Sequence, residues 1–282
     1  QGATPAARQS RFRGVPGKRS SLSSLSRAPI AIVAAMHEEL GALLALMPDE
    51  QRVRVAGRDF WVGHLHGQPV VAVLSRIGKV AAAITATVLL ERFGVRAIVF
   101  TGVAGGLAPG VNVGDVVVAT QLLQHDLDAS PIFPKYEVPL MGLSRFAADA
   151  AMADALAAVA ETTLRDPVAL LGQEAVDEFG LRSPKVHRGL LVSGDRFVST
   201  TAESAALQRA FPDALAVEME GASVAQVCHD YGVPFAAMRT ISDRADDAAH
   251  GDFSRFVVAV ASRYSLALVD AWLASLSPRE LS

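Results

Sequence analysis

Short apolar runs alternate with segments of helical pattern along most of this chain. Apolar runs of about four to eight residues bounded by turn residues indicate strands, and longer stretches rich in Ala, Leu, Glu and Lys indicate helices. The expected strands are Pro29–Ala35, Phe60–His66, Pro69–Ser75, Arg96–Gly102, Val113–Leu122, His187–Val192, the first half of Ala214–Glu220, and Pro234–Ile241. The expected helices are Glu38–Leu46, Gly78–Phe93, Arg145–Glu161, one near Ala202–Ala210, one from Gly221 to about Asp230, and one from about Asp252 to Leu276. This alternation predicts a single α/β domain over residues 29–282 with a largely parallel or mixed sheet.

Glycines mark several of the predicted boundaries. Gly67-Gln68 separates two expected strands and predicts a β-hairpin. Gly94 follows an expected helix and predicts its end. Thr101–Leu107 reads Thr-Gly-Val-Ala-Gly-Gly-Leu and predicts a glycine-rich turn after a buried strand. Residues 162–185 have no clear period, so we expect an irregular surface insertion there.

Residues 1–28 differ from the rest of the chain in composition. They hold six basic residues and no acid, are rich in Ser, Gly and Pro, and have no apolar period, which predicts a disordered basic extension. The composition also fits a transit peptide. We favour an upstream extension unrelated to the fold, because the sequence starts at Gln1 rather than Met.

Outside that extension, charge and cysteine content exclude several classes of protein. The net charge there is −9, from 20 basic and 29 acidic residues, which argues against a nucleic-acid-binding protein. No apolar run approaches the roughly 18 uninterrupted residues of a membrane span. Cys228 is the only cysteine, which excludes an internal disulfide and fits a reducing, cytoplasmic location.

The stretch Ala214–Glu220 places two carboxylates, Glu218 and Glu220, where a buried strand meets a helix. Ionisable groups at such a point are unfavourable unless they are paired or used, and ligands in α/β sheets gather at strand ends. The alternative is a solvated helix start, where acids favour the positive end of the helix dipole. A second stretch with the same layout, Arg239–Asp243, favours a functional site.

The residues at the other strand ends limit which reactions the site could catalyse. The histidines are scattered without zinc spacing, so we expect no metal. The glycines 102, 105 and 106 would let a ligand approach the backbone, but the stretch lacks the Lys of a phosphate-binding loop. No Gly-x-Ser-x-Gly stretch indicates a serine hydrolase. Glu39, Glu220 and Asp243 follow separate strands, and metal-free carboxylates suit the proton transfer and cation stabilisation of glycosidic bond cleavage.

Several stretches of the chain resemble the 5′-methylthioadenosine/S-adenosylhomocysteine nucleosidases of the purine nucleoside phosphorylase superfamily. Each matching stretch is weak alone, but together they follow the family order from residue 32 to residue 246. The matching stretches are Ile32–Leu40, Gly78–Ala82, Thr101–Pro109, Val113–Val118, Val192–Phe197, Phe211–Gly221 and Val233–Asp246. The resemblance implies a nucleoside phosphorylase-like fold, in which helices flank a central mixed, twisted, barrel-like sheet. It also implies hydrolysis of the bond between ribose and adenine, without a cofactor.

The resemblance also implies roles for individual residues. Asp243 matches the general acid that protonates adenine N7, which needs a raised pKa, and Ser242 would orient it. Glu39 matches the group that activates the attacking water, and its register from Met36 favours it over Glu38. The resemblance also implies that Arg239 makes a second contact to the water and that Glu220 accepts a hydrogen bond from the ribose 2′-hydroxyl. Met219 would pack under the ribose, and Ile77 would contact the 5′-alkylthio group. Phe197 would stack on adenine, and the main chain of Val198 would hydrogen-bond the edge of adenine.

Some features depart from the family or stay open. Val103 stands where these nucleosidases often carry a Ser near the ribose, so one hydrogen bond, worth about 0.5–1.5 kcal/mol, is absent. Gly105 is a candidate backbone contact. Relatives form homodimers in which a loop closes the neighbouring pocket, so we expect a homodimer with Ile132, Phe133 and Pro139 as candidates. Asp195 is expected to brace its loop, and Glu218 has no family role.

Two other functions stay open from sequence alone. A phosphate-dependent purine nucleoside phosphorylase is the nearer alternative, although relatives that use phosphate place an Arg just after the first strand, where this chain has Met36–Glu39. A non-catalytic nucleoside-binding protein is the other, motivated by Val103 and the basic extension. The three carboxylates Glu39, Glu220 and Asp243 argue against it.

Overall fold

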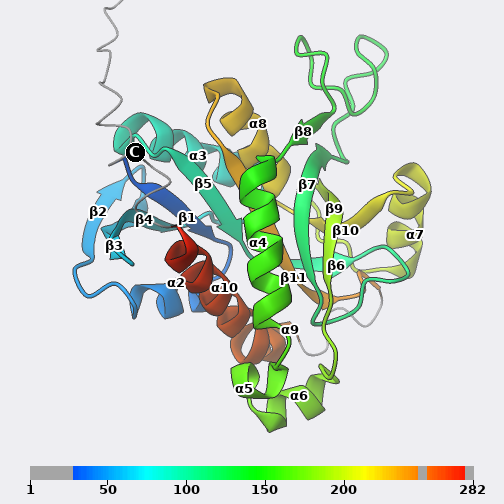
Figure 1. Cartoon of the computed structure of the whole chain (residues 1–282). Helices are drawn as coiled ribbons and strands as arrows, with labels where there is room; N and C mark the ends of the chain where they lie inside the picture. Colours follow the sequence, from blue (N-terminus) through cyan, green and yellow to red (C-terminus); the bar gives the residue numbers. More distant parts are fainter. Residues whose placement is uncertain (1–27, 247–252, 277–282) are drawn as a thin grey trace, which may run out of the picture.

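The computed structural model describes residues 28–246 and 253–276 (Figure 1). The prediction of a disordered extension therefore lies, except for residue 28, outside the described residues. The strands are β1 (Ile30–Ala34), β2 (Gln51–Val55), β3 (Arg58–Leu65), β4 (Gln68–Leu74), β5 (Ala97–Thr101), β6 (Val103–Gly106), β7 (Val116–Gln124), β8 (Arg145–Ala147), β9 (Val186–Ser193), β10 (Ala214–Glu218) and β11 (Phe235–Asp243). The helices are α2 (His37–Leu44), α3 (Lys79–Phe93), α4 (Ala150–Thr163), α5 (Pro167–Leu171), α6 (Gln173–Phe179), α7 (Thr201–Ala210), α8 (Gly221–Tyr231), α9 (Phe253–Phe256), the π-helical turn η1 (Val257–Ala261) and α10 (Ser262–Ser275).

The strands form one mixed sheet in the order β2-β3-β4-β1-β5-β11-β6-β10-β9-β7-β8. An additional antiparallel pairing of β11 with β7 closes β11, β6, β10, β9 and β7 into a small barrel. The long strand β11 belongs to both parts, because its first half pairs with β5 and its second half with β6. The predicted α/β fold with a barrel-like mixed sheet flanked by helices is confirmed.

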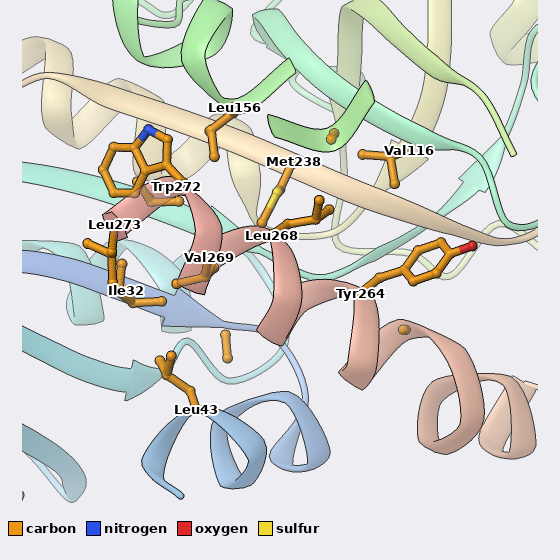
Figure 2. Close-up of a cluster of buried hydrophobic side chains, with 14 of the residues drawn as sticks. Ile32, Leu43, Val116, Leu156, Met238, Tyr264, Leu268, Val269, Trp272 and Leu273 are labelled. Carbon is orange, nitrogen blue, oxygen red and sulfur yellow. The ribbon is translucent and has the colours of Figure 1, made fainter. Parts of the chain in front are cut away.

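Helices cover both faces of the sheet, which explains why its central strands read as unbroken apolar runs. Ile30 and Ile32 of β1 pack in one hydrophobic cluster, whereas Ala31 and Val33 pack in the other. Figure 2 shows the first cluster, in which Trp272 and Leu268 of α10 lie beside β1, α2, α4 and β11. The second cluster takes side chains from α3 and α8. The strands are therefore buried on both faces by side chains of the flanking helices.

The helix from Phe253 to Ser275 is long and apolar enough to cross a membrane by length and composition, with a mean hydropathy of 1.5. Its side chains Tyr264, Leu268 and Trp272 are instead buried within the core. The same pattern fits the core helix of a globular protein, and this burial favours that interpretation.

Several local predictions agree with the structure. β3 and β4 form the expected hairpin. α3 ends at Gly94, whose φ of 60° is the left-handed conformation that glycine adopts most easily.

Other local predictions are wrong. Residues 162–185 are not an irregular insertion, because they contain α5 and α6, whose Leu171 and Val176 are buried in the core. The expected glycine-rich turn is largely the strand β6, held by pairing to β10 and β11. The expected helix from residue 145 begins at Ala150, after the strand β8. β2 was not predicted, because its alternating Arg and Val residues are those of an exposed edge strand.

Candidate active site

A cavity of about 200 Å³ lies where β1, β10 and β11 end and β6 begins. Parallel strands of α/β sheets commonly hold ligands at this edge. The lining residues are Ala35, Met36, Ile77, Val103, Ala104, Gly105, Arg196, Phe197, Val198, Val217, Glu218, Met219, Glu220, Ser242, Asp243 and Phe253. Nine of the eleven predicted site residues line this cavity together, and the two exceptions are Glu39 and Arg239.

The turn between β10 and α8 carries both of its carboxylates into the cavity wall. Glu218 is buried, and its carboxylate accepts hydrogen bonds from the backbone N–H of Glu220 at 3.1 Å and of Gly221 at 2.9 and 3.0 Å. Ser193 Oγ and Arg239 Nη2 also donate to it, the latter at 2.8 Å. The alternative of a solvated helix start is therefore wrong. Glu218 braces the turn that positions its neighbour.

Glu220 is the carboxylate of this turn that keeps capacity for a ligand. It is buried at the cavity, and its Oε1 accepts a hydrogen bond from the backbone N–H of Gly78 at 2.8 Å. Burial, followed by the charge of Glu218, raises the pKa of Glu220 to about 7. A carboxylate held this way binds a hydroxyl or a developing cation strongly, because either partner relieves its unfavourable burial.

Asp243 is the last residue of β11 and also lines the cavity. Ser242 Oγ donates to Asp243 Oδ2 at 2.7 Å, and the backbone N–H of Ala245 donates to Oδ1 at 2.7 Å. β6 passes close beside it, because a Cβ placed on Gly105 would lie 2.9 Å from Asp243 Oδ1. The glycine is therefore needed for this approach, and the predicted orienting contact of Ser242 is present.

Glu39 lies behind the cavity wall at the first turn of α2. Its side chain is buried and accepts hydrogen bonds from Met36 N at 3.1 Å and from Ser265 Oγ at 2.6 Å. Thr101 Oγ1 is 2.6 Å from the same Ser265 Oγ, so α10 and β5 together fix the carboxylate. Burial raises the pKa of Glu39, and these hydrogen bonds oppose the rise. Glu38 is exposed, which agrees with the choice of Glu39.

Arg239 is fully buried beneath the site and does not line the cavity. Its guanidinium pairs with Glu218 and donates to the carbonyls of Phe100 and Met238 at 3.0 Å. Its charge also lowers the pKa values of Glu39 and Glu220 against the effect of burial. The direct water contact expected for Arg239 stays a prediction. In this structure the guanidinium holds the Glu218 carboxylate in place.

The remaining walls are apolar and partly open to solvent. Phe197 is 41% exposed and Ile77 is 73% exposed, both at the cavity mouth. Phe253 was missed from the sequence, where it is one more apolar residue of the closing helix. Its ring packs edge-on against that of Phe197, with centroids 6.3 Å apart and an interplanar angle of 81°. Two aromatic rings beside a row of carboxylates suit a flat heterocycle attached to a polar sugar.

The cavity therefore combines buried carboxylates with aromatic side chains beside a small β-barrel. Such a site suits an enzyme that cleaves a bond through a positively charged transition state. The family model described as the phosphorylase superfamily matches residues 29–274, and the chain belongs to that family. It is 38% identical over 229 residues to the 5′-methylthioadenosine/S-adenosylhomocysteine nucleosidase of Anoxybacillus flavithermus. The match covers 81% of this chain and 90% of the relative. The predicted resemblance is confirmed.

Solved structures agree with this family. The nucleosidase of the same name from Neisseria meningitidis, in complex with methylthio-immucillin-A, has a TM-score of 0.78 and 33% identity, covering 88% of this chain and 100% of that one. The futalosine hydrolase of Helicobacter pylori has a TM-score of 0.74 and 32% identity, covering 89% of this chain and 99% of that one. In the described part of the chain, no group of His, Cys, Asp and Glu side chains could hold a metal ion.

Proposed function

We propose that this protein hydrolyses the N-glycosidic bond of 5′-methylthioadenosine, S-adenosylhomocysteine or both, releasing adenine and the 5-thio-substituted ribose. The observation that carries the proposal is that Glu220 and Asp243 line one small cavity, and that the Glu39 carboxylate is hydrogen-bonded to the backbone of Met36 in the same lining. Among the described residues, the only cation lining the cavity is Arg196, which is exposed and paired with Glu203. Such a site favours a cationic sugar and disfavours phosphate.

In this mechanism the charges develop where the carboxylates stand. Asp243 donates a proton to adenine N7 as the bond breaks, with Ser242 holding it in position. Glu220 accepts a hydrogen bond from the ribose 2′-hydroxyl and stabilises the oxocarbenium-like sugar. Glu39 takes the proton of the attacking water, and Arg239 keeps this cluster ordered and is also proposed to contact that water.

The apolar residues position the nucleoside. Phe197 stacks on adenine, the main chain of Val198 reads its edge, and Met219 packs under the ribose. Ile77 meets the 5′-alkylthio group. Val103 and Gly105 form the wall beside the ribose, where Val103 offers no side-chain hydroxyl.

The first test is the variant Asp243→Asn, assayed for adenine release in phosphate-free buffer. We expect a loss of about 10²–10⁴-fold in kcat, with substrate binding largely kept, because the amide has no acidic proton. A purine analogue whose leaving group needs no protonation should lose far less. Glu39→Gln should slow both substrates, because each needs activated water. Equal slowing of both substrates by Asp243→Asn would move the acid elsewhere, with Asp246 or Asp247 next, of which Asp247 lies outside the described residues.

The same assay separates the alternatives. Strict dependence of adenine release on added phosphate would assign the protein as a phosphorylase. Tight binding of methylthioadenosine without turnover by clean protein would make it a nucleoside-binding protein instead.

We further propose a homodimer. The apolar side chains of Ile132 and Leu140 are 82% and 91% exposed, and Val80 of α3 is 72% exposed, which favours cover by a second copy. Phe133 and Pro139 of the same loop are candidates for contact. Sedimentation showing a fully active monomer at micromolar concentration would contradict this.

A cytoplasmic location and a role in methionine salvage are also proposed. The location is supported by the buried, unpaired thiol of Cys228. Fractionation of cells that express the protein tests the location. Accumulation of methylthioadenosine after loss of the protein tests the role.

A further inference from the structure

A second cavity of about 470 Å³ lies between β3, α2 and the segment that follows β4. We refer to it as the β3–α2 cavity. Its apolar lining consists of Leu40, Leu44, Trp61 and Leu74. Its polar lining consists of His37, Gly41, Gly57, Arg58, Asp59 and Arg76. This combination suits a ligand with an aliphatic stem and a charged end.

The β3–α2 cavity adjoins the active-site cavity. β1 and β4 pair in parallel with Ala34 opposite Leu74, and Ser75 N donates to the Ala34 carbonyl at 2.9 Å (Figure 1). The segments 35–37 and 75–77 therefore leave the sheet side by side. Met36 and Ile77 line the active-site cavity. Their chain neighbours, His37 after Met36 and Arg76 before Ile77, line the β3–α2 cavity. One pair of segments thus forms the wall between the two cavities.

Two guanidinium groups in the β3–α2 cavity have only neutral partners. Arg58 donates to Thr85 Oγ1 at 2.7 Å and to two backbone carbonyls, and Arg76 donates to the Gly57 carbonyl. Within the described part of the chain, neither forms an ion pair with a carboxylate. Burial, followed by the charge of Arg76, lowers the pKa of Arg58, so the two groups feel each other's charge. A carboxylate ligand would relieve this repulsion.

The cavity also offers one acid to a positive group. The nearest cationic atoms to the Asp59 carboxylate are on Arg52 and Arg54, at 4.0 Å, which is outside hydrogen-bond distance. Asp59 and Arg76 therefore present opposite charges within one cavity. This pattern matches the ammonium and carboxylate of an α-amino acid.

Arg76 occupies a backbone conformation that favours glycine. Its φ is 64°, in the left-handed region that non-glycine residues adopt rarely. Its side chain is exposed and extends to the turn at Gly57. A residue kept in such a conformation at the edge of a cavity indicates use of its side chain.

We propose that the β3–α2 cavity binds the amino-acid end of S-adenosylhomocysteine, with Arg76 receiving the carboxylate and Asp59 the ammonium. This inference rests on the proposed function. A methylthio group ends beside Ile77, whereas the homocysteine chain continues past the sulfur and must leave the small active-site cavity. Arg76 is then a specificity-determining residue, which favours long zwitterionic 5′ substituents over short uncharged ones.

The test is the ratio of kcat/KM for S-adenosylhomocysteine to kcat/KM for methylthioadenosine. In Arg76→Gly the ratio should fall about tenfold, the effect of one lost charge-assisted hydrogen bond at an open site. Glycine suits the backbone conformation, so this variant should fold. The matched control is Arg92→Ala, which removes an exposed Arg at the far end of α3 and should leave the ratio unchanged.

Two substrate analogues separate the charges. The 5′-(3-carboxypropylthio) analogue of adenosine carries only the carboxylate, and the 5′-(3-aminopropylthio) analogue carries only the ammonium. Arg76→Glu should slow cleavage of the carboxylate analogue relative to the ammonium analogue. Of the two analogues, Asp59→Asn should slow only the ammonium analogue. An unchanged ratio in Arg76→Gly, with methylthioadenosine still cleaved, would overturn this inference alone. Failure of the parent protein to cleave methylthioadenosine would overturn the proposed function itself.

Discussion

The variant Glu218→Gln tests whether the buried ion pair under the site holds it together. The side chains of Arg239 and Glu218 are 0% and 2% exposed, and their charged atoms are 2.8 Å apart. Both oxygens of Glu218 accept hydrogen bonds. An amide in its place removes the charge and turns one acceptor into a donor that faces other donors.

The magnitude follows from the charge left behind. Removing one partner of a buried ion pair destabilises a protein by about 3–5 kcal/mol, because the remaining charge stays buried without compensation. For a domain of this size that corresponds to a fall in Tm of roughly 10 °C. The surface pair of Arg145 and Asp213, in which the Asp213 side chain is 56% exposed, should contribute about 0–1 kcal/mol. Asp213→Asn is therefore the matched control.

The assay is urea unfolding at pH 7 of four proteins. They are the parent, Glu218→Gln, the control Asp213→Asn, and the double variant Glu218→Gln with Arg239→Met. The double variant should recover most of the lost stability, because it leaves no unpaired charge. If Glu218→Gln unfolds within about 1 kcal/mol of the parent, or if Arg239→Met brings no recovery, the ion pair does not have the structural role described above.

Three further predictions concern the acids of the site. Ser265→Ala removes a hydrogen bond that lowers the pKa of Glu39, so the acidic limb of the kcat/KM profile should move to higher pH, with a roughly tenfold loss near neutrality. Gly105→Ala forces a Cβ to within 2.9 Å of Asp243 Oδ1, and steady-state kinetics should show a loss on the order of 10²-fold in kcat. Because the pKa of Glu220 is raised from 4.5 to about 7, its contribution to stability is complete below about pH 4.5 and is lost as the pH rises through about 7. The free energy of unfolding should therefore fall across that window, and Glu220→Gln should flatten the fall.

The amino-acid sequence by itself determined the strands that are buried on both faces and the acids that follow them. Unbroken apolar runs such as Ile30–Ala34 can only be central strands or core helices, and their length favours strands. Glu220 and Asp243 were found for the same reason, since a carboxylate directly after a buried strand is costly unless it is used. These patterns are local in the sequence, so they can be interpreted without knowledge of the fold.

Contacts between distant segments were decided only by the tertiary structure. Ser265 lies 226 positions from the Glu39 that it hydrogen-bonds, and Glu218 of β10 pairs with Arg239 of β11, a strand that is not its neighbour in the sheet. No sequence pattern at Ser265 or Glu218 predicts which residue it contacts. Phe253 was hidden for a similar reason, because an aromatic residue in an apolar helix has the same pattern whether it faces the core or a cavity.

The glycine-rich stretch and the second cavity show the same limit. Val103–Gly106 has the composition of a turn, and it becomes a strand because β10 and β11 supply its hydrogen-bond partners when the barrel closes. Arg76 and Asp59 are ordinary surface residues in the sequence, and they share a cavity only because β3, β4 and β1 lie side by side. Strand order is set by the packing of the whole chain, and so the sequence determined which residues end the strands, whereas the fold decided which of them meet.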